Sequence, residues 1–435
     1  MDYAEHYRDL ATDLPGQDLP WLRSLRQQAE AVFSQHGFPS PREEAWRYTN
    51  VTPIEKKRFL PLTAHPSEPD CGELLARYRL PEAWVLVFVD GLFSAGHSDL
   101  AGLPEGVLAM PMAEALAHHP DRVRASLQAE SDGADSRFVD FTNAYFRDGA
   151  FLHIGAGIAL PRPVQLLHLS TRPEGLSVLR HAVILEHHAE ASVIETYAGE
   201  DSAGYLTSTV TSLHLGEGAR LEHGKFQVES PRSYHFASLV TTQQAASQLR
   251  QQHLAFGGLI ARTDIHSWLG RDTDCTLDGL FMVSGRRHLD THFLLRHGAP
   301  HARSRAHYRG IAAERGRGVF AGRIVVDAGA EKTDADMSSR NLLLSEDAEI
   351  DCQPQLEILT DDVKCSHGVT IGQLEAEAVF YLQSRGLDEV AARNTLTFAF
   401  ANEQVEKIRL ATLRQQVRDT LLRALPQTDI RADWL

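Results

Sequence analysis

The chain has 435 residues, a formal net charge of −15 and 43% hydrophobic residues. These values are ordinary for a soluble globular protein. The acidic balance argues against nucleic-acid binding, which needs a basic face to displace counterions, and against binding to anionic membrane surfaces. No apolar stretch approaches the roughly 20 residues that a membrane-spanning helix needs.

Cysteine usage and the N-terminus indicate the compartment. The four cysteines, Cys71, Cys275, Cys352 and Cys365, form no C-x-x-C pair. The N-terminus has neither a basic region nor an apolar region of a secretory signal. We therefore expect reduced thiols and a cytoplasmic protein.

Residues 1–149 are predicted to form a mainly helical region. Apolar residues recur with a 3.6-residue period from Leu19 to Phe33, and further helices are expected over 112–119, 121–129 and 138–147. The short β-branched run from Trp84 to Asp90 predicts one buried strand. The prolines between residues 61 and 82 predict a loop or linker.

Residues 150–368 have a different pattern, with a repeat of about 14 residues. A small residue is followed two places later by Leu, Val or Thr, and pairs that lie two repeats apart resemble each other most. The pairs are Ala191/Val193, Ala219/Leu221, Ser247/Leu249, Ala261/Thr263 and Cys275/Leu277. This pattern predicts a right-handed parallel β-helix core with two strands in each coil of about 28 residues. An antiparallel sandwich is the alternative, but the hairpin turns that it requires are scarce.

Residues 369–435 are predicted to form a C-terminal helical region. Helices are expected over 373–384, 389–400 and about 403–425, with Asp388 as the N-cap of the second. Helices at both ends of a β-helix would cover backbone groups that the terminal strands leave unpaired.

The segment Asp361–Gly368 (DDVKCSHG) holds the strongest candidate site. In an extended strand Cys365 and His367 point to one face, about 6.6 Å apart along the chain. A thiolate and an imidazole so placed suit iron or zinc, and Lys364 and His367 are expected to lower the thiol pKa. Two ligands are too few for a stable site, so a second chain would supply the others. The alternative is a buried cysteine and a hydrogen-bonded histidine.

The histidine pairs and an arginine-rich run are weaker candidates for a functional site. The pairs His288/His292 and His297/His301 have helical ligand spacing, but in strands they lie more than about 13 Å apart. An arginine-rich run predicts a solvated face, with an anion or an acidic partner as the alternative. Its members are Arg303, Arg305, Arg309, Arg315, Arg317 and Arg323.

Known nucleotide and hydrolase motifs are absent: the chain has no Walker A loop, H-E-x-x-H, G-x-S-x-G or S-x-x-K. Two alternative functions remain for a β-helix. One is a secreted-type carbohydrate-active enzyme, for which Asp272, Asp274 and Asp278 are the nearest candidates. The other is a self-associating structural protein.

Three stretches give the sequence a resemblance to a known family. They are Arg42–Thr49 (REEAWRYT), Phe141–Gly149 (FTNAYFRDG) and Asp361–Gly386 (DDVKCSHGVTIGQLEAEAVFYLQSRG). On these residues the chain resembles the SufB/SufD family of iron–sulfur cluster assembly proteins over nearly its whole length. The lack of a C-x-x-C motif and the presence of C-S-H at the end of the predicted β-helix favour the SufD branch over the SufB branch.

The resemblance implies a non-catalytic scaffold subunit of a SufBCD complex. It would pair with SufB through the β-helices and bind the ATPase SufC through its C-terminal helices. Cys365 and His367 would lie at the SufB junction and hold iron or a nascent iron–sulfur cluster shared with SufB. The resemblance further implies a reduced flavin in the complex, for which no residue here indicates a site. It leaves open whether the isolated chain forms a homodimer.

Overall fold

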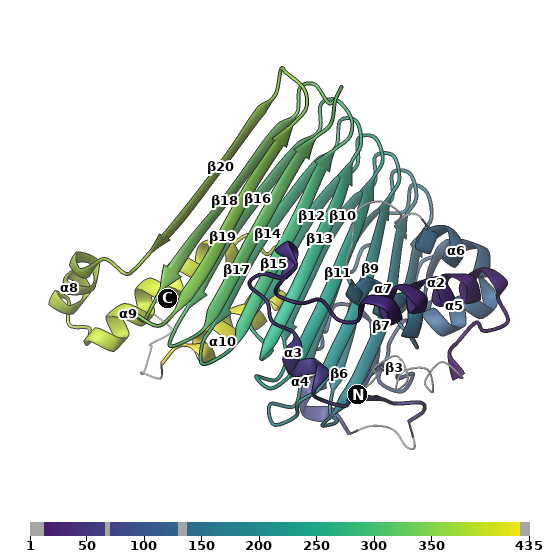
Figure 1. Cartoon of the computed structure of the whole chain (residues 1–435), viewed down its shortest axis with the longest axis horizontal. Helices are drawn as coiled ribbons and strands as arrows, with labels where there is room; N and C mark the ends of the chain where they lie inside the picture. Colours follow the sequence, from purple (N-terminus) through teal and green to yellow (C-terminus); the bar gives the residue numbers. More distant parts are fainter. Residues whose placement is uncertain (1–12, 66–69, 129–136, 427–435) are drawn as a thin grey trace.

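The computed structural model describes residues 13–65, 70–128 and 137–426. Its core is a β-solenoid of two ten-stranded sheets, whose strands stack along the length of the molecule in Figure 1. Sheet A contains β1 (Leu60–Pro61), β4 (Val107–Pro111), β5 (Ala150–Ile154), β7 (Gly175–Leu185), β9 (Leu206–Leu215), β11 (Tyr234–Gln243), β13 (Ile260–Leu269), β15 (His288–His297), β17 (Arg317–Val326) and β19 (Glu349–Ile358).

The strands of sheet B alternate with those of sheet A along the chain. They are β2 (Trp84–Val89), β3 (Leu92–Phe93), β6 (Val164–Ser170), β8 (Glu190–Gly199), β10 (Arg220–Val228), β12 (Gln248–Ala255), β14 (Asp274–Val283), β16 (Arg303–Ala312), β18 (Asp334–Leu343) and β20 (Lys364–Gly372). From β6 to β20 every pairing is parallel, and among the strands of the described residues β2 with β3 and β4 with β5 are the antiparallel pairs. The predicted parallel β-helix core is confirmed.

The coil length varies along the solenoid. Leu221 pairs with Leu249, as the predicted period requires, but the next coil is slightly shorter, because Leu249 pairs with Cys275. Near the C-terminal end Phe320 pairs with Cys352, which makes that coil longer than either of the other two. The predicted period therefore holds only in the middle of the core, because turns of different length absorb the changes while each strand keeps its register.

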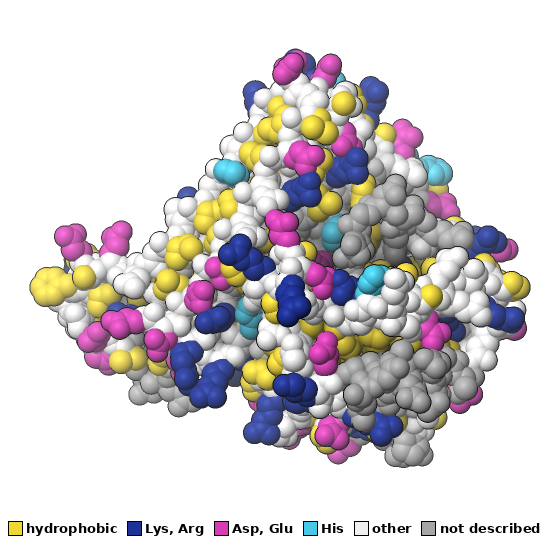
Figure 2. All heavy atoms as spheres, viewed as in Figure 1, with side chains coloured by type: hydrophobic (Ala, Val, Ile, Leu, Met, Phe, Trp, Pro, Cys, Tyr) yellow, Lys and Arg dark blue, Asp and Glu magenta, His cyan; other side chains and the backbone are white. Residues whose placement is uncertain are grey.

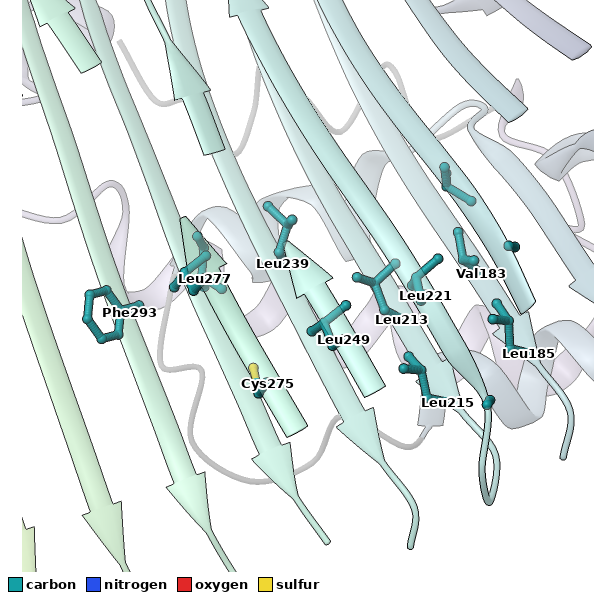
Figure 3. Close-up of a cluster of buried hydrophobic side chains, with 14 of the residues drawn as sticks. Val183, Leu185, Leu213, Leu215, Leu221, Leu239, Leu249, Cys275, Leu277 and Phe293 are labelled. Atoms are coloured by element: carbon teal, nitrogen blue, oxygen red, sulfur yellow. The ribbon is translucent and has the colours of Figure 1, made fainter. Parts of the chain in front are cut away.

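Apolar side chains fill the narrow space between the sheets. Figure 3 shows Leu221, Leu249 and Leu277 of sheet B against Leu213 and Leu239 of sheet A. Helices also cover the outer faces of several strands, so alternation along these strands does not separate core from solvent. In β10, Leu221 faces the space between the sheets, whereas Phe226 packs under the C-terminal helices.

A buried ionic cluster occupies another part of the same interior. Lys225 Nζ lies 2.7 Å from His235 Nε2, and His235 Nδ1 lies 2.7 Å from a Glu229 carboxylate oxygen. A second pair, His223 and Glu195, lies 2.9 Å apart, and both side chains are fully buried. Burial lowers the pKa of Lys225 to about 8, although both carboxylates oppose that shift.

N-terminal helices cover the outer face of sheet A over β7, β9 and β11, and one of them, Gly72–Tyr78, packs on sheet B instead. The helices before residue 150 are α2 (Pro20–His36), α3 (Thr52–Glu55), α4 (Gly72–Tyr78), α5 (Met112–His118), α6 (Pro120–Gln128) and α7 (Arg137–Tyr145). Aromatic packing joins them to the sheet: the rings of Phe138 and Phe236 stack with their centroids 3.9 Å apart. The predicted helices and the buried strand are present, but α4 lies in the segment that we expected to be a loop.

The C-terminal region consists of α8 (Ala376–Ser384), α9 (Glu389–Val405) and α10 (Ala411–Ala424). Asp388 caps α9 as predicted, accepting a hydrogen bond from the Ala391 amide at 2.8 Å. The predicted helix over 403–425 is wrong in its first part, because α9 continues to Val405 and α10 begins only at Ala411. Between them the chain packs against sheet B: Ile408 is buried and the Gln252 amide donates to the Lys407 carbonyl.

No helix among the described residues is long and apolar enough to cross a membrane.

Candidate functional site

The last coil of the solenoid leaves two strands with a free edge. β19 is the end strand of sheet A and β20 the end strand of sheet B. Each has a hydrogen-bonded neighbour on one side only, within the part of the chain that the structure describes. Such an edge presents backbone N–H and C=O groups to which another strand can pair. Figure 1 shows β20 at the end of the molecule opposite α5 and α6.

Cys365 and His367 both lie on β20, and their register shows which way they face. Cys365 pairs with Ala335 of β18, and His367 pairs with Met337. Ala335 and Met337 are both buried between the sheets. Cys365 and His367 therefore continue the inward face of sheet B, and the predicted shared face is confirmed. Because no further coil covers them, Cys365 is only half buried and His367 is exposed.

The electrostatic surroundings of the Cys365 thiol differ from the prediction. Burial raises its pKa, and the negative charge of Asp334 adds to this effect, while a backbone hydrogen bond with Ala335 opposes it. The expectation that Lys364 and His367 lower this pKa is wrong. Lys364 alternates to the other face of the strand, where its charge acts on its register partner Asp334. Metal binding would have to displace the thiol proton.

Sequence reasoning missed a second thiol in the same coil. Cys352 of β19 pairs with buried Phe320 and so faces inward from sheet A. Its Sγ accepts a hydrogen bond from Asn341 Nδ2 at 3.3 Å, and burial raises its pKa to about 11. Its separation from Cys365, close to half a coil along the chain, was the available signal.

The chain by itself does not bring together a complete metal site. Among the described residues no group of three or more His, Cys, Asp or Glu side chains is placed to hold a metal ion. Cys365 and His367 would supply two ligands from one strand, and a tetrahedral site needs more. Whether these two residues bind iron stays a prediction.

The other histidine candidates have structural partners. His288 Nε2 lies 2.8 Å from the Thr49 hydroxyl, and His292 Nε2 lies 3.0 Å from an Asp290 carboxylate oxygen. His297 Nε2 lies 2.8 Å from the Ser304 hydroxyl, between the sheets. These contacts join the strands and the N-terminal region, so they explain these histidines without a ligand.

The arginine-rich run is largely paired with carboxylates. Arg305 pairs with Asp334 at 2.7 Å, and Arg317 pairs with Glu349 at 3.2 Å. The remaining pairs are Arg303 with Asp274 and Asp334, Arg309 with Glu403, and Arg323 with Glu357. The run is therefore mostly a network of salt bridges. Two of the three carboxylates considered for a carbohydrate-active site are also engaged, since Asp278 pairs with Lys407 and Asp274 with Arg303.

An exposed apolar surface lies next to β20. Phe380 and Tyr381 of α8 are 71% and 56% exposed, and Ile371 of β20 is 46% exposed. In Figure 1 α8 projects from the end of the molecule, and Figure 2 shows hydrophobic side chains at that position. Exposed large apolar side chains can mark interaction sites.

Comparison with known proteins gives matches over most of the chain. Residues 168–400 match the family model described as "SUF system FeS cluster assembly, SufBD core domain", and residues 1–166 match "SufBD protein N-terminal region". The iron–sulfur cluster assembly protein SufD of Escherichia coli is 31% identical over 408 residues, 92% of each chain. An iron–sulfur cluster assembly SufBD family protein of Synechocystis is 30% identical over 91% of this chain and 90% of its own length. Chloroplastic protein ABCI7 of Arabidopsis thaliana is 28% identical over 96% and 89% of the two chains.

Proposed function

Since the chain belongs to the SufB/SufD family of iron–sulfur cluster assembly proteins, we propose that it is the SufD-type scaffold subunit of a SufBCD complex. In this role it carries no catalytic residue, and ATP hydrolysis takes place in the partner SufC. The iron–sulfur cluster is a product assembled on the complex and passed on.

The partner SufB is proposed to bind at the open end of the solenoid. The free edges of β19 and β20 would each add a strand from a second solenoid, which satisfies the unpaired backbone groups of both chains. The inward residues of the last coil, which a monomer leaves half exposed, would then be covered. The same surface would form the homodimer that the sequence left open.

Cys365 and His367 are proposed as the residues that this chain contributes to the junction. The single observation that supports this most strongly is their common inward face on a strand with no neighbour beyond it. A thiol and an imidazole there would meet side chains of SufB, and together these would hold iron or a nascent cluster. Iron accepts both ligand types.

SufC is proposed to bind the exposed apolar surface formed by Ile371, Phe380 and Tyr381. β20 ends at Gly372 and α8 begins at Ala376, so only a short connection separates the junction strand from this surface. A movement of α8 driven by SufC would reach β20 through this connection. The reduced flavin implied by the family remains without an assigned residue.

The proposal is tested by co-expressing the chain with SufB and SufC and measuring the mass of the purified complex, followed by its iron and sulfide content. We expect one complex containing all three proteins, with cluster assembly that depends on this chain. Recovery of SufB and SufC without the chain, with unchanged cluster content, would disprove the scaffold role.

A further inference from the structure

A cavity of about 580 Å³ lies between α10 and the turns that lead from sheet B to sheet A. None of its lining residues lies on β20, the strand that carries Cys365 and His367. α4 contributes Arg77 and Tyr78, α10 contributes Arg423, and the turn after β14 contributes Arg286 and Arg287. Its volume falls in the range of small-molecule sites in proteins.

The four arginines of this cavity form no salt bridge with a carboxylate in the described part of the chain. This contrasts with the arginine-rich run on β16 and β17, where five of six guanidinium groups form salt bridges. Two exposed carboxylates, Asp201 and Glu314, also line the cavity, and so does a third, Glu229, whose side chain is buried. Glu229 is already engaged on its inner side by His235, Thr207 and Gln227. In a protein of net charge −15, the cavity thus has a local excess of positive charge.

The arrangement keeps like charges close together. The pKa of Arg423 is lowered by burial and then by the nearby charge of Arg77, while Tyr78, Asp419 and Asp201 oppose this shift. Arg287 is fixed in one orientation, because it donates to the Ser284 carbonyl at 3.0 Å and to the Phe256 carbonyl at 2.8 Å. Neighbouring cations cost free energy in the empty state, and a bound anion would remove that cost. Guanidinium groups form paired hydrogen bonds to phosphate oxygens.

The base of the cavity is apolar. Tyr78 and Phe256 both pack edge-on against the buried ring of Phe226, which holds them in place. Met282 and Val228 complete this wall. A cationic rim over an aromatic and aliphatic wall suits a ligand with an anionic group at one end and an apolar or planar group at the other.

We propose that this cavity binds a phosphorylated small organic molecule, with its phosphoryl group at Arg77, Arg286 and Arg423 and its organic part against Tyr78 and Phe256. Several guanidinium groups around one anion match the multiple negative charges of a phosphate or pyrophosphate better than a single carboxylate. The site is independent of the proposed scaffold role, because it requires neither SufB nor SufC.

Calorimetric titration of the isolated full chain at low salt tests the proposal, with pyrophosphate, AMP, adenosine and citrate as probes. Pyrophosphate and AMP are expected to bind saturably, and adenosine is not. Binding should weaken as salt is raised. In the double variant Arg77→Gln/Arg423→Gln the affinity for both should fall at least tenfold, since two charge-assisted contacts are lost. Arg271→Gln, which removes an exposed arginine from the turn between β13 and β14, should leave it unchanged.

Three outcomes would overturn the proposal. The first is the absence of saturable binding of pyrophosphate and AMP to the unmodified chain. The second is unchanged affinity in the double variant, whose fold is checked by its urea denaturation curve. The third is binding of citrate without binding of either phosphate compound, which would assign the cavity to carboxylates. Binding of pyrophosphate but not AMP would refute the part of the proposal that places an organic group against Tyr78 and Phe256.

Discussion

Cys365 and His367 face the same side of the terminal strand, one beside buried Ala335 and the other beside buried Met337. In any earlier coil, side chains in these positions would be sealed between the two sheets. Here the solenoid stops, so a thiol and an imidazole stand at an open end. A second solenoid that docks there would cover them and complete their surroundings.

The surface on α8 predicts loss of SufC binding when one aromatic side chain is removed. Phe380 is 71% exposed, so Phe380→Ser should not change the free energy of unfolding by more than about 0.5 kcal/mol. It should nevertheless reduce the amount of SufC that copurifies with the chain by at least tenfold, while SufB is retained. Val32→Ser, at an exposed position of α2, is the matched control and should retain both partners. Equal SufC recovery in Phe380→Ser would place the SufC surface elsewhere.

His168 predicts a stabilising substitution. Its ring stacks between Phe88 and Tyr197, and in the described residues neither ring nitrogen has a hydrogen-bond partner. Because an unsatisfied buried polar group costs about 1–3 kcal/mol, His168→Phe should raise the free energy of unfolding by about 1 kcal/mol in urea denaturation.

The control for His168 is another buried histidine that does have partners. His235 lies between Lys225 and Glu229. His235→Phe should lower the free energy of unfolding by about 3 kcal/mol or more, because it removes the hydrogen-bond partner of the buried Lys225 and one of the partners of the buried Glu229. If His168→Phe and His235→Phe changed the free energy of unfolding in the same direction and by a similar amount, the proposed role of His235 in the buried ionic cluster would be contradicted.

The interior histidines predict instability in acid. Burial lowers the pKa of His181 to about 4, and burial together with the charge of Lys225 lowers the pKa of His235. These imidazoles are neutral in the folded chain, whereas the unfolded chain takes up protons below about pH 6.5. The unfolded state therefore binds more protons between about pH 6.5 and 4, and the free energy of unfolding falls as the pH is lowered. Denaturation midpoints at pH 7.5, 6.5 and 5.5 should decrease in that order; a constant midpoint would refute the prediction.

Arg262 predicts a strong dependence of stability on one side chain that joins the N-terminal region to sheet A. It donates to Asp264 and Asp290, and its guanidinium lies 3.8 Å from the centre of the Trp46 ring. Arg262→Ala would leave two buried carboxylates without their cation, at a cost of about 3–5 kcal/mol in urea denaturation.

Arg220 provides the matched control for Arg262. Its contact with Glu190 is 3.9 Å long and both side chains are mostly exposed. An exposed pair of this kind contributes about 0–1 kcal/mol, so Arg220→Ala should have little effect. Equal losses of unfolding free energy in the two variants would show that Arg262 does not hold the N-terminal region on sheet A.

The sequence predicted the parallel solenoid because its repeat follows directly from stacking. Residues that share a register, such as Leu221 and Leu249, must both fit the same narrow interior. Similar residues therefore recur in the sequence at intervals of one coil. The same reasoning predicted the shared face of Cys365 and His367, since alternation along a strand needs no knowledge of the tertiary structure.

The polar interior was not predictable from the pattern. In β10 the inward residues include His223 and Lys225, whereas apolar Phe226 points outward under the C-terminal helices. In this strand polar side chains therefore point into the solenoid and an apolar side chain points out of it, which is the reverse of the usual pattern. The pairing of His223 with Glu195 and of Lys225 with His235 stabilises those inward positions.

Contacts between distant segments explain the other differences. The position of Lys364 beside Asp334 depends on the register of β18 and β20, so the raised pKa of Cys365 could not be inferred from nearby residues in the sequence. The arginine cavity likewise joins α4, α10 and several turns that no local motif connects.

We propose above that Cys365 and His367 take part in cluster assembly at the junction with SufB. The most direct test is the iron and acid-labile sulfide content of the complex purified with unmodified chain, with Cys365→Ser and with His367→Ala. Because both side chains lie at the open end, we expect both variants to form the complete complex. His367→Ala is expected to lose at least nine tenths of the cluster content of the unmodified protein, and Cys365→Ser is expected to lose part of it. Complexes of both variants with the cluster content of the unmodified protein would contradict this proposal.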